Sequence, residues 1–189
     1  MKDADDGALA RAAATGDVAA FALLMRRHRE LVYRLVRAHI GDADEALDLV
    51  QETFLSAYRA IGRYDPARSM RAWLSAIALN KCRDWGRRRT VRRWLSHALP
   101  IDAVAERVAT DVAGADVVAA DRAELARVAA AIARLPATLK EPLILRTIEG
   151  LNQAEAAAVL GVSEKAVETR LYRARAKLAV LLGASGAGG

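Results

Sequence analysis

Apolar side chains recur every three or four positions along most of the chain, which is the spacing of one face of an α-helix. The first such run follows Asp17, a residue that can cap a helix, and it ends at Gly41. Its apolar positions are Val18, Phe21, Leu24, Leu31, Leu35 and Ile40. Residues 1–16 are acidic, and we expect a loose N-terminal segment there.

A second and a third helix are predicted directly after the first. Asp42 and Glu45 have the spacing of a capping box, and the stripe that follows them consists of Ala46, Leu49, Val50, Phe54, Ala57 and Ile61. The next segment, 62–69, reads as a loop, and Ser69 can cap the helix after it. The inner face of that helix consists of Trp73, Leu74, Ile77, Ala78 and Trp85. Residues 17–93 therefore predict one compact three-helix unit.

The periodicity weakens in residues 94–121, which are mostly small and include Pro100 and Gly114, so we expect a flexible linker. A second helical unit is predicted over 122–182. Its first helix is striped by Leu125, Val128, Ile132 and Leu135 and is stopped by Pro136. Two capping boxes are predicted, Thr138 with Glu141 and Asn152 with Glu155. Residues 183–189 are expected to form a flexible tail.

The composition supports an all-α chain of two small helical domains. Strand-length runs of β-branched and aromatic residues are scarce, and aromatic residues make up only 5% of the chain. The apolar fraction of 53% is sufficient for a buried core in each unit.

The end of the second unit has the pattern of a helix-turn-helix. Gly161 to Ser163 separates a short helix with many alanines from a longer one, whose apolar stripe is Val167, Leu171, Ala174 and Leu178. The outward side of the longer helix is polar and basic, as required of a helix that enters the major groove. The candidate DNA-binding residues are Ser163, Lys165, Ala166, Thr169, Arg170, Arg173 and Arg175. The alternative is an ordinary helical hairpin with a charged surface.

Charge is concentrated at the end of the third predicted helix. Residues 81–93 contain seven basic residues and one acidic residue, Asp84, so this segment holds a net charge of +6, equal to that of the whole chain. Such a block, next to Asn80, suits contact with a polyanion, and the alternative is a solvated helix end. Trp73 is expected in the core, whereas Trp85 suits either the core or a platform for unpaired bases. Cys82, the only cysteine, is expected to be buried or half-buried.

Acidic residues crowd the second predicted helix. Asp42, Asp44 and Glu45 suit the dipole at its first turn. A second group lies beyond that turn: Asp48, Gln51 and Glu52. A basic protein partner is one explanation for this group, and spacing alone leaves the question open.

Three segments, in this order, resemble a bacterial RNA polymerase sigma factor of the extracytoplasmic-function (ECF) type. They are DLVQETFLSAYRAI (48–61), RAWLSAIALNKCRDWGRRR (71–89) and LNQAEAAAVLGVSEKAVETRLYRARAKL (151–178). The resemblance implies a transcription initiation factor, with region two at 17–93 and region four at 122–182. It departs from many relatives at Lys165, Ala166 and Glu168, and Glu168 either reads a base or pairs within the protein.

The resemblance also implies roles for particular residues. Those implied to bind the clamp of the polymerase β′ subunit are Asp48, Gln51 and Glu52. Those implied to bind and open the minus-ten promoter element are Tyr64, Asn80, Arg83, Arg87 and Arg88. Region four is implied to read the minus-thirty-five element as duplex, and an anti-sigma factor is an expected partner.

Other functions leave parts of the sequence unexplained. A plain helix-turn-helix repressor accounts for 122–182 but not for the acidic and basic helices before it. No glutamate is followed three residues later by histidine, so a di-iron bundle is excluded, and we expect no enzyme activity, cofactor or metal site. The longest uncharged run, 178–189, is too short and polar to span a bilayer, and no signal-peptide pattern is present. We expect a cytoplasmic bacterial protein without membrane insertion.

Overall fold

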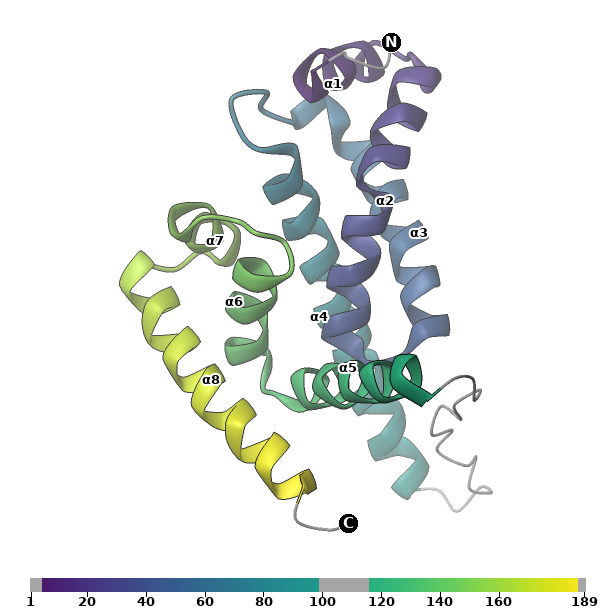
Figure 1. Cartoon of the computed structure of the whole chain (residues 1–189). Helices are drawn as coiled ribbons and strands as arrows, with labels where there is room; N and C mark the ends of the chain where they lie inside the picture. The colour runs from purple at the N-terminus through teal and green to yellow at the C-terminus, as the bar shows by residue number, and fades with distance from the viewer. Residues whose placement is uncertain (1–4, 99–115, 187–189) are drawn as a thin grey trace.

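The computed structural model describes residues 5–98 and 116–186, and every regular element in these two ranges is helical (Figure 1). In chain order they are α1 (Asp6–Ala14), α2 (Val18–Ile40), α3 (Ala43–Ala60), the short 3-10 helix η1 (Ile61–Arg63), α4 (Met70–Ala98), α5 (Asp116–Arg134), α6 (Ala137–Thr147), α7 (Gln153–Leu160) and α8 (Glu164–Gly186). The predicted all-α fold class is confirmed.

The first unit is a bundle in which α2, α3 and α4 all pack against one another. Its core is lined by fully buried side chains such as Val32, Leu35 and Ala46, and by Leu79 and Cys82 from α4. Burial raises the pKa of the Cys82 thiol to about 12, so this cysteine stays protonated and unreactive. The prediction of a buried or half-buried cysteine is confirmed.

The part of the N-terminal segment that the structure describes is mostly helical, which corrects the expectation of a loose segment at 1–16 for Asp6–Ala14; residues 1–4 lie outside the described residues. α1 lies across the top of the bundle and packs on α2 and η1 (Figure 1). It buries Leu9, Ala10 and Ala13, which lie on one face of the helix. Asp6 fixes its start by contacting Arg27 at 3.0 Å and His28 at 2.7 Å. A short alanine-rich helix gives little periodic signal, and this tertiary pairing across more than twenty residues is not visible in local sequence.

The predicted ends of α2 and α3 are confirmed. Asp17 caps α2 by accepting a hydrogen bond from the Ala20 amide at 3.0 Å, and Gly41 ends the helix with a left-handed φ of +82°. Asp42 then caps α3 by accepting from two amides, those of Asp44 and Glu45. Only Gly41 and Asp42 separate the two helices, which form an antiparallel pair.

The second unit consists of α5 to α8, in which α6 packs on α7 and α8 and α5 packs on α8. Helices α4 and α5 both reach into the region predicted as linker, 94–121, and only residues 99–115 of it lie outside the described residues. Thr90 does not break α4, because its hydroxyl donates to the Gly86 carbonyl at 2.9 Å within the helix. At the C-terminus α8 continues to Gly186, so most of the tail predicted at 183–189 is helical.

The two units lie against each other. Helices α5 and α6 pack on α2, while α6 and α7 pack on α4, and α8 lies on the side of α6 away from the first unit (Figure 1). The backbones approach closely at Gly41, where an added Cβ would lie 2.9 Å from the Cβ of Ala133 in α5. We call this contact region, where α2 and α4 meet α5, α6 and α7, the junction.

Replacing Gly41 with alanine tests this close approach. The variant carries both the cost of a left-handed φ at a non-glycine residue, about 1–2 kcal/mol, and a steric clash with Ala133. Gly16→Ala is the matched control, because Gly16 has a φ of +100° and nothing within 4 Å of an added Cβ. Urea unfolding should show a larger loss of unfolding free energy for Gly41→Ala; equal losses would contradict the close packing at the junction.

Candidate nucleic-acid and polymerase interfaces

Helices α7 and α8 form the predicted helix-turn-helix. Asn152 and Glu155 make the full capping box, with Asn152 Oδ1 accepting from the Glu155 amide at 2.9 Å and Glu155 Oε2 accepting from the Asn152 amide at 2.8 Å. Gly161 turns the chain with a φ of +65°, and Ser163 Oγ accepts from the Ala166 amide at 3.2 Å to cap α8. The turn is therefore built by the residues that the sequence indicated.

Most of the candidate duplex-binding residues lie on the exposed side of α8. Val167, Leu171 and Ala174 are buried against α6 and α7, as predicted. Five of the candidate duplex-binding residues are exposed: Ser163, Lys165, Thr169, Arg173 and Arg175. The other two, Ala166 and Arg170, are half-buried. Tyr172 is 76% exposed on the same helix and was not among the candidates. A large aromatic ring left in solvent beside arginines suits contact with a sugar or phosphate.

Glu168 pairs with Lys165 in this structure, with Lys165 Nζ 2.9 Å from Glu168 Oε2. The sequence left two roles open for Glu168, a base contact or a pair within the protein, and this structure has the internal pair. Both side chains are mostly exposed, so the pair contributes little stability and its two members can exchange partners when DNA arrives.

The candidate minus-ten residues do not all share one surface. Asn80, Arg87 and Arg88 are exposed on α4, and Arg83 is half-buried on the same helix. Tyr64 is only 9% exposed; its hydroxyl donates to the Arg68 carbonyl at 2.6 Å and its ring packs against Trp73. In this structure Tyr64 holds the loop before α4 together, and it does not face the surface that the other four share.

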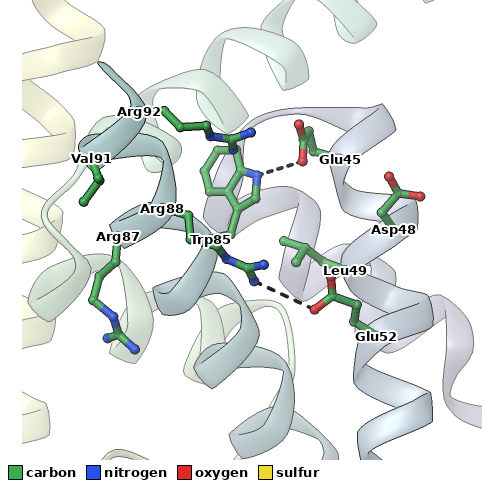
Figure 2. A pocket seen from close by; sticks show the side chains of 9 residues that line it. All are labelled: Glu45, Asp48, Leu49, Glu52, Trp85, Arg87, Arg88, Val91 and Arg92. Atoms are coloured by element: carbon green, nitrogen blue, oxygen red, sulfur yellow. Dashed lines mark hydrogen bonds and ion pairs between the residues drawn. The ribbon is translucent and has the colours of Figure 1, made fainter. Parts of the chain in front are cut away.

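A groove of about 580 Å³ separates α3 from the second half of α4 (Figure 2). At one side, the Trp85 indole donates to Glu45 Oε2 at 2.8 Å, and the Arg89 guanidinium lies 5.1 Å from the Trp85 ring centre. The Glu45 carboxylate is therefore bonded to α4, and it does not accept from the Asp42 amide as the predicted capping box requires. The sequence left open whether Trp85 lies in the core or on the surface as a platform for bases. In the structure its ring is half-buried, and the hydrogen bond to Glu45 fixes its orientation.

The acidic surface of α3 is partly neutralised by α4. Glu52 Oε2 lies 3.6 Å from Lys81 Nζ and 3.9 Å from Arg88 (Figure 2). Asp48 and Gln51 are exposed and point away from the bundle core. Two exposed leucines flank them on the same helix, Leu47 at 45% and Leu55 at 50%, and sequence reasoning missed these. The four side chains give α3 a mixed polar and apolar face suited to a protein partner.

The junction between the units holds a buried cluster of charged side chains. Arg83 of α4 donates to both carboxylate oxygens of Glu141 on α6, at 2.8 and 2.6 Å, and Glu141 is only 4% exposed. His39 Nε2 of α2 lies 3.5 Å from the same carboxylate. Burial by itself would raise the pKa of Glu141, but the two hydrogen bonds from Arg83 and the nearby His39 outweigh it and hold the pKa at about 2.

This contact explains why the capping box predicted for Thr138 with Glu141 is wrong. α6 begins after Pro136, whose carbonyl accepts from the Leu139 and Lys140 amides at 2.9 Å, and no side chain caps it. The Glu141 carboxylate points to the junction instead of back along its own helix. An ion pair with a residue 58 positions away is stronger than a local cap, and sequence spacing gives no sign of it.

Lys140 ties together the C-terminal ends of two helices at the junction. Its ammonium donates to the His39 carbonyl at 2.9 Å, in the last turn of α2, and to the Ala133 carbonyl in the last turn of α5. These carbonyls have no partner within their own helices, and the negative end of each helix dipole favours a cation there. The lysine is buried, which lowers its pKa, but its bonds keep the charge satisfied.

Glu149 is a second buried acid at the junction, only 1% exposed. Its Oε2 accepts from the Ser75 hydroxyl at 3.5 Å, and Oε1 has no hydrogen-bond partner in the described part of the chain. Burial raises the pKa of this carboxyl to about 7, against smaller opposing effects of Arg71 and Arg34. Arg71 bonds the backbone here, donating to the Glu149 carbonyl at 2.8 Å.

The described residues give no sign of a metal centre or a membrane span. Within residues 5–98 and 116–186, no three of the possible ligand residues His, Cys, Asp and Glu gather as a metal site would require. In the same ranges no helix combines the length and apolar character needed to cross a bilayer.

Two family comparisons match the two units. Sigma-70 region 2 matches residues 24–92, and Sigma-70 region 4 matches residues 125–178. The chain is 44% identical to the RNA polymerase sigma factor CnrH of Cupriavidus metallidurans over 181 residues, covering 95% of each protein. It is 35% identical to the ECF RNA polymerase sigma factor SigM of Mycobacterium tuberculosis, covering 94% of this chain and 85% of SigM.

A solved structure shows the same overall arrangement. The structure of CnrH in complex with the cytosolic domain of CnrY superposes with a TM-score of 0.70 at 38% identity, and the match covers 95% of this chain and 97% of CnrH. Because nearly the whole of both chains is superposed, the likeness extends over both helical units.

The raised pKa of Glu149 predicts a pH-dependent stability. The folded protein keeps a proton on this carboxyl up to about pH 7, whereas the unfolded chain releases it near the ordinary pKa of 4.5. The free energy of unfolding should therefore fall as pH rises through that window. Glu149→Gln removes the ionisation, so it should stabilise the protein at pH 8 by roughly 2 kcal/mol and by little at pH 5.

Urea unfolding at the two pH values measures this difference. Glu124→Gln is the matched control, since Glu124 is an exposed member of an ion pair within α5. Equal effects of Glu149→Gln at pH 5 and pH 8 would contradict the buried, protonated carboxyl.

Proposed function

Because the chain belongs to the bacterial RNA polymerase sigma factors of the ECF type, we propose that it divides promoter recognition between its two helical units. Sigma factors are transcription initiation factors and not enzymes. In this proposal α8 reads duplex DNA upstream, α4 opens and binds the downstream element, and α3 holds the polymerase.

Reading of the minus-thirty-five element is assigned to the outward face of α8. A helix whose N-terminal residues are exposed can meet base edges in the major groove, and its flanking arginines can meet phosphates. Thr169 and the Ala166 methyl offer short contacts near the helix start, and Arg173 and Arg175 lie further along. The exchangeable pair of Lys165 with Glu168 makes these two residues the place where sequence preference is set.

Opening of the minus-ten element is assigned to Asn80, Arg83, Arg87 and Arg88 on α4. Unpairing costs a few kcal/mol per base, and contacts to the separated strand offset part of that cost. Arginines that follow the phosphates and an amide that bonds a base edge can supply these contacts. Tyr64 is left with a structural role, because its hydroxyl is already bonded to Arg68.

The polymerase contact is assigned to the exposed face of α3. Asp48, Gln51 and Glu52 supply polar groups, and the exposed Leu47 and Leu55 supply apolar area. We assign this face to the clamp of the β′ subunit, in the cytoplasm where the polymerase works. The relative CnrH is held by the cytosolic domain of CnrY, and we propose that an anti-sigma factor likewise controls this chain.

The observation that carries the proposal is the presence of three distinct surfaces on one chain. A plain helix-turn-helix repressor needs only α8, whereas here a basic face on α4 and a partly apolar acidic face on α3 accompany it. Initiation of transcription by core polymerase plus this protein separates the two functions, because a repressor only blocks it.

Placing positive charges on the exposed face of α3 should weaken polymerase binding and leave DNA binding intact. In Asp48→Lys/Gln51→Lys two exposed residues become cations, so packing is spared while a basic partner is repelled. We expect at least a tenfold weaker affinity for core polymerase and a matching loss of run-off transcription. Duplex binding by α8 in the same variant is the internal control, and undiminished core binding would show that the α3 assignment is wrong.

Arg173→Ala should weaken binding of promoter duplex by about 1–3 kcal/mol if the arginine bonds a base. If it bonds a phosphate, the slope of log affinity against log salt concentration should become shallower by about one. Arg134→Ala on α5 is matched in charge and exposure and lies outside α8. Fluorescence anisotropy over a salt series measures both quantities. Identical binding curves for the two variants would contradict the reading face.

A further inference from the structure

The last turns of α4 have no role in the proposed function. Arg88 is the last residue of this helix that is assigned to the minus-ten strand, yet α4 continues to Ala98 and its end extends past α5 (Figure 1). Every residue from Arg87 to Leu95 is exposed, so these turns pack little against the rest of the chain. Their surface is open for a further contact.

Three large apolar side chains lie in solvent on these turns. Trp94 is 73% exposed, Val91 61% and Leu95 53%, whereas the other two tryptophans, Trp73 and Trp85, are half-buried. Spacings of three and four residues place the three exposed side chains on one side of the helix. Large apolar side chains that gather in solvent mark a contact site, unlike ones that are scattered singly over the surface.

This apolar patch lies within a strongly basic segment. Between Asp84 and Asp102 the sequence has no acidic residue and has five arginines: Arg87, Arg88, Arg89, Arg92 and Arg93. Such a surface attracts a polyanion. It also continues directly from the residues of α4 that are assigned to the separated strand. Charge and continuity together favour DNA as the partner of the patch.

The position of the patch along α4 indicates which part of the promoter it reaches. An α-helix advances about 1.5 Å per residue, so Trp94 lies about 9 Å beyond Arg88, which is fewer than three base pairs of duplex. The chain leaves α4 towards the unit that is assigned to the minus-thirty-five element, so this direction is upstream. The DNA there is paired, because opening is confined to the minus-ten side.

The side chains of the patch suit the minor groove of duplex DNA. A helix about 10 Å across does not fit a groove about 6 Å wide, but side chains at its end can enter. Apolar side chains and arginines are the usual contacts there, because the groove is narrow and has a strongly negative potential. The three apolar side chains offer only one hydrogen-bond donor, the Trp94 indole N–H, which is too few to read the major-groove pattern.

We infer that Trp94, with Leu95 and Arg92, forms a third DNA contact, in the minor groove of the duplex directly upstream of the minus-ten element. The inference rests on the proposed function of α4. It extends promoter recognition into the DNA between the two elements. A·T pairs leave that groove free, whereas the amino group of guanine obstructs it.

Trp94→Ala tests this contact without touching a residue assigned to strand opening or to polymerase binding. Leu125→Ala on α5 is the matched control, because Leu125 is also a large apolar residue and is 70% exposed. Holoenzyme made from the full-length protein and host core polymerase is titrated against two probes by fluorescence anisotropy. One probe is the single strand of the minus-ten element, and the other, a fork, adds about ten base pairs of upstream duplex to it.

We expect Trp94→Ala to bind the fork about tenfold more weakly than the wild type, because the ring no longer buries apolar surface against the duplex. Its affinity for the single strand should be unchanged, and Leu125→Ala should match the wild type on both probes. Leu95→Ala should show a smaller loss that is likewise confined to the fork. If Trp94→Ala loses helicity by circular dichroism, Leu95→Ala decides in its place.

Inosine in place of guanine identifies the groove, since it lacks only the amino group that guanine presents in the minor groove. The wild type should bind a fork with I·C pairs in the upstream duplex more tightly than one with G·C pairs. Trp94→Ala should lose this preference. Equal affinity of the wild type for the two forks would overturn the minor-groove contact.

The remaining outcomes separate this inference from the proposed function. An equal loss on both probes, or no loss on the fork, would overturn the duplex contact while strand binding by the wild type stands. Weaker binding of Trp94→Ala to core polymerase without DNA would place the patch against protein and overturn the contact as well. If wild-type holoenzyme bound neither probe and made no transcript, the proposed function itself would fail.

Discussion

Glu141 and Lys140 are charged side chains buried at the junction, and their need for partners on other helices constrains how the two halves of the chain meet. An isolated charge in a protein interior costs several kcal/mol, whereas a charge with fitted hydrogen bonds is tolerated. Glu141 has Arg83, and Lys140 has the free carbonyls at the ends of α2 and α5. Gly41 then allows α5 to approach, because no Cβ stands between it and Ala133.

Three surfaces with different tasks remain around this junction. The face of α3 is open to a protein, the outer face of α8 is open to duplex DNA, and the basic side of α4 is open except near Arg83. This division explains why the sequence needs both an acidic and a basic helix beside a helix-turn-helix.

Local signals predicted the helices, and long-range pairing decided where prediction failed. Asp17, Gly41, Asn152 and Ser163 act through hydrogen bonds or φ angles within four residues, so their spacing alone identified helix ends. The faces of α2, α3 and α8 follow equally from periodicity. By contrast, the contact of α1 with Arg27, that of Glu45 with Trp85 and the pairing of Glu141 with Arg83 join residues 21 to 58 positions apart. Each of these depends on a partner that the local pattern does not contain.

The central claim is that this chain directs initiation by core polymerase through a protein-binding face on α3 and DNA-binding faces on α4 and α8. Core polymerase together with the wild-type protein should give run-off transcripts from a host promoter, and the Asp48→Lys/Gln51→Lys variant should give far fewer. A wild-type protein that binds promoter duplex but yields no transcript with core polymerase would contradict the account.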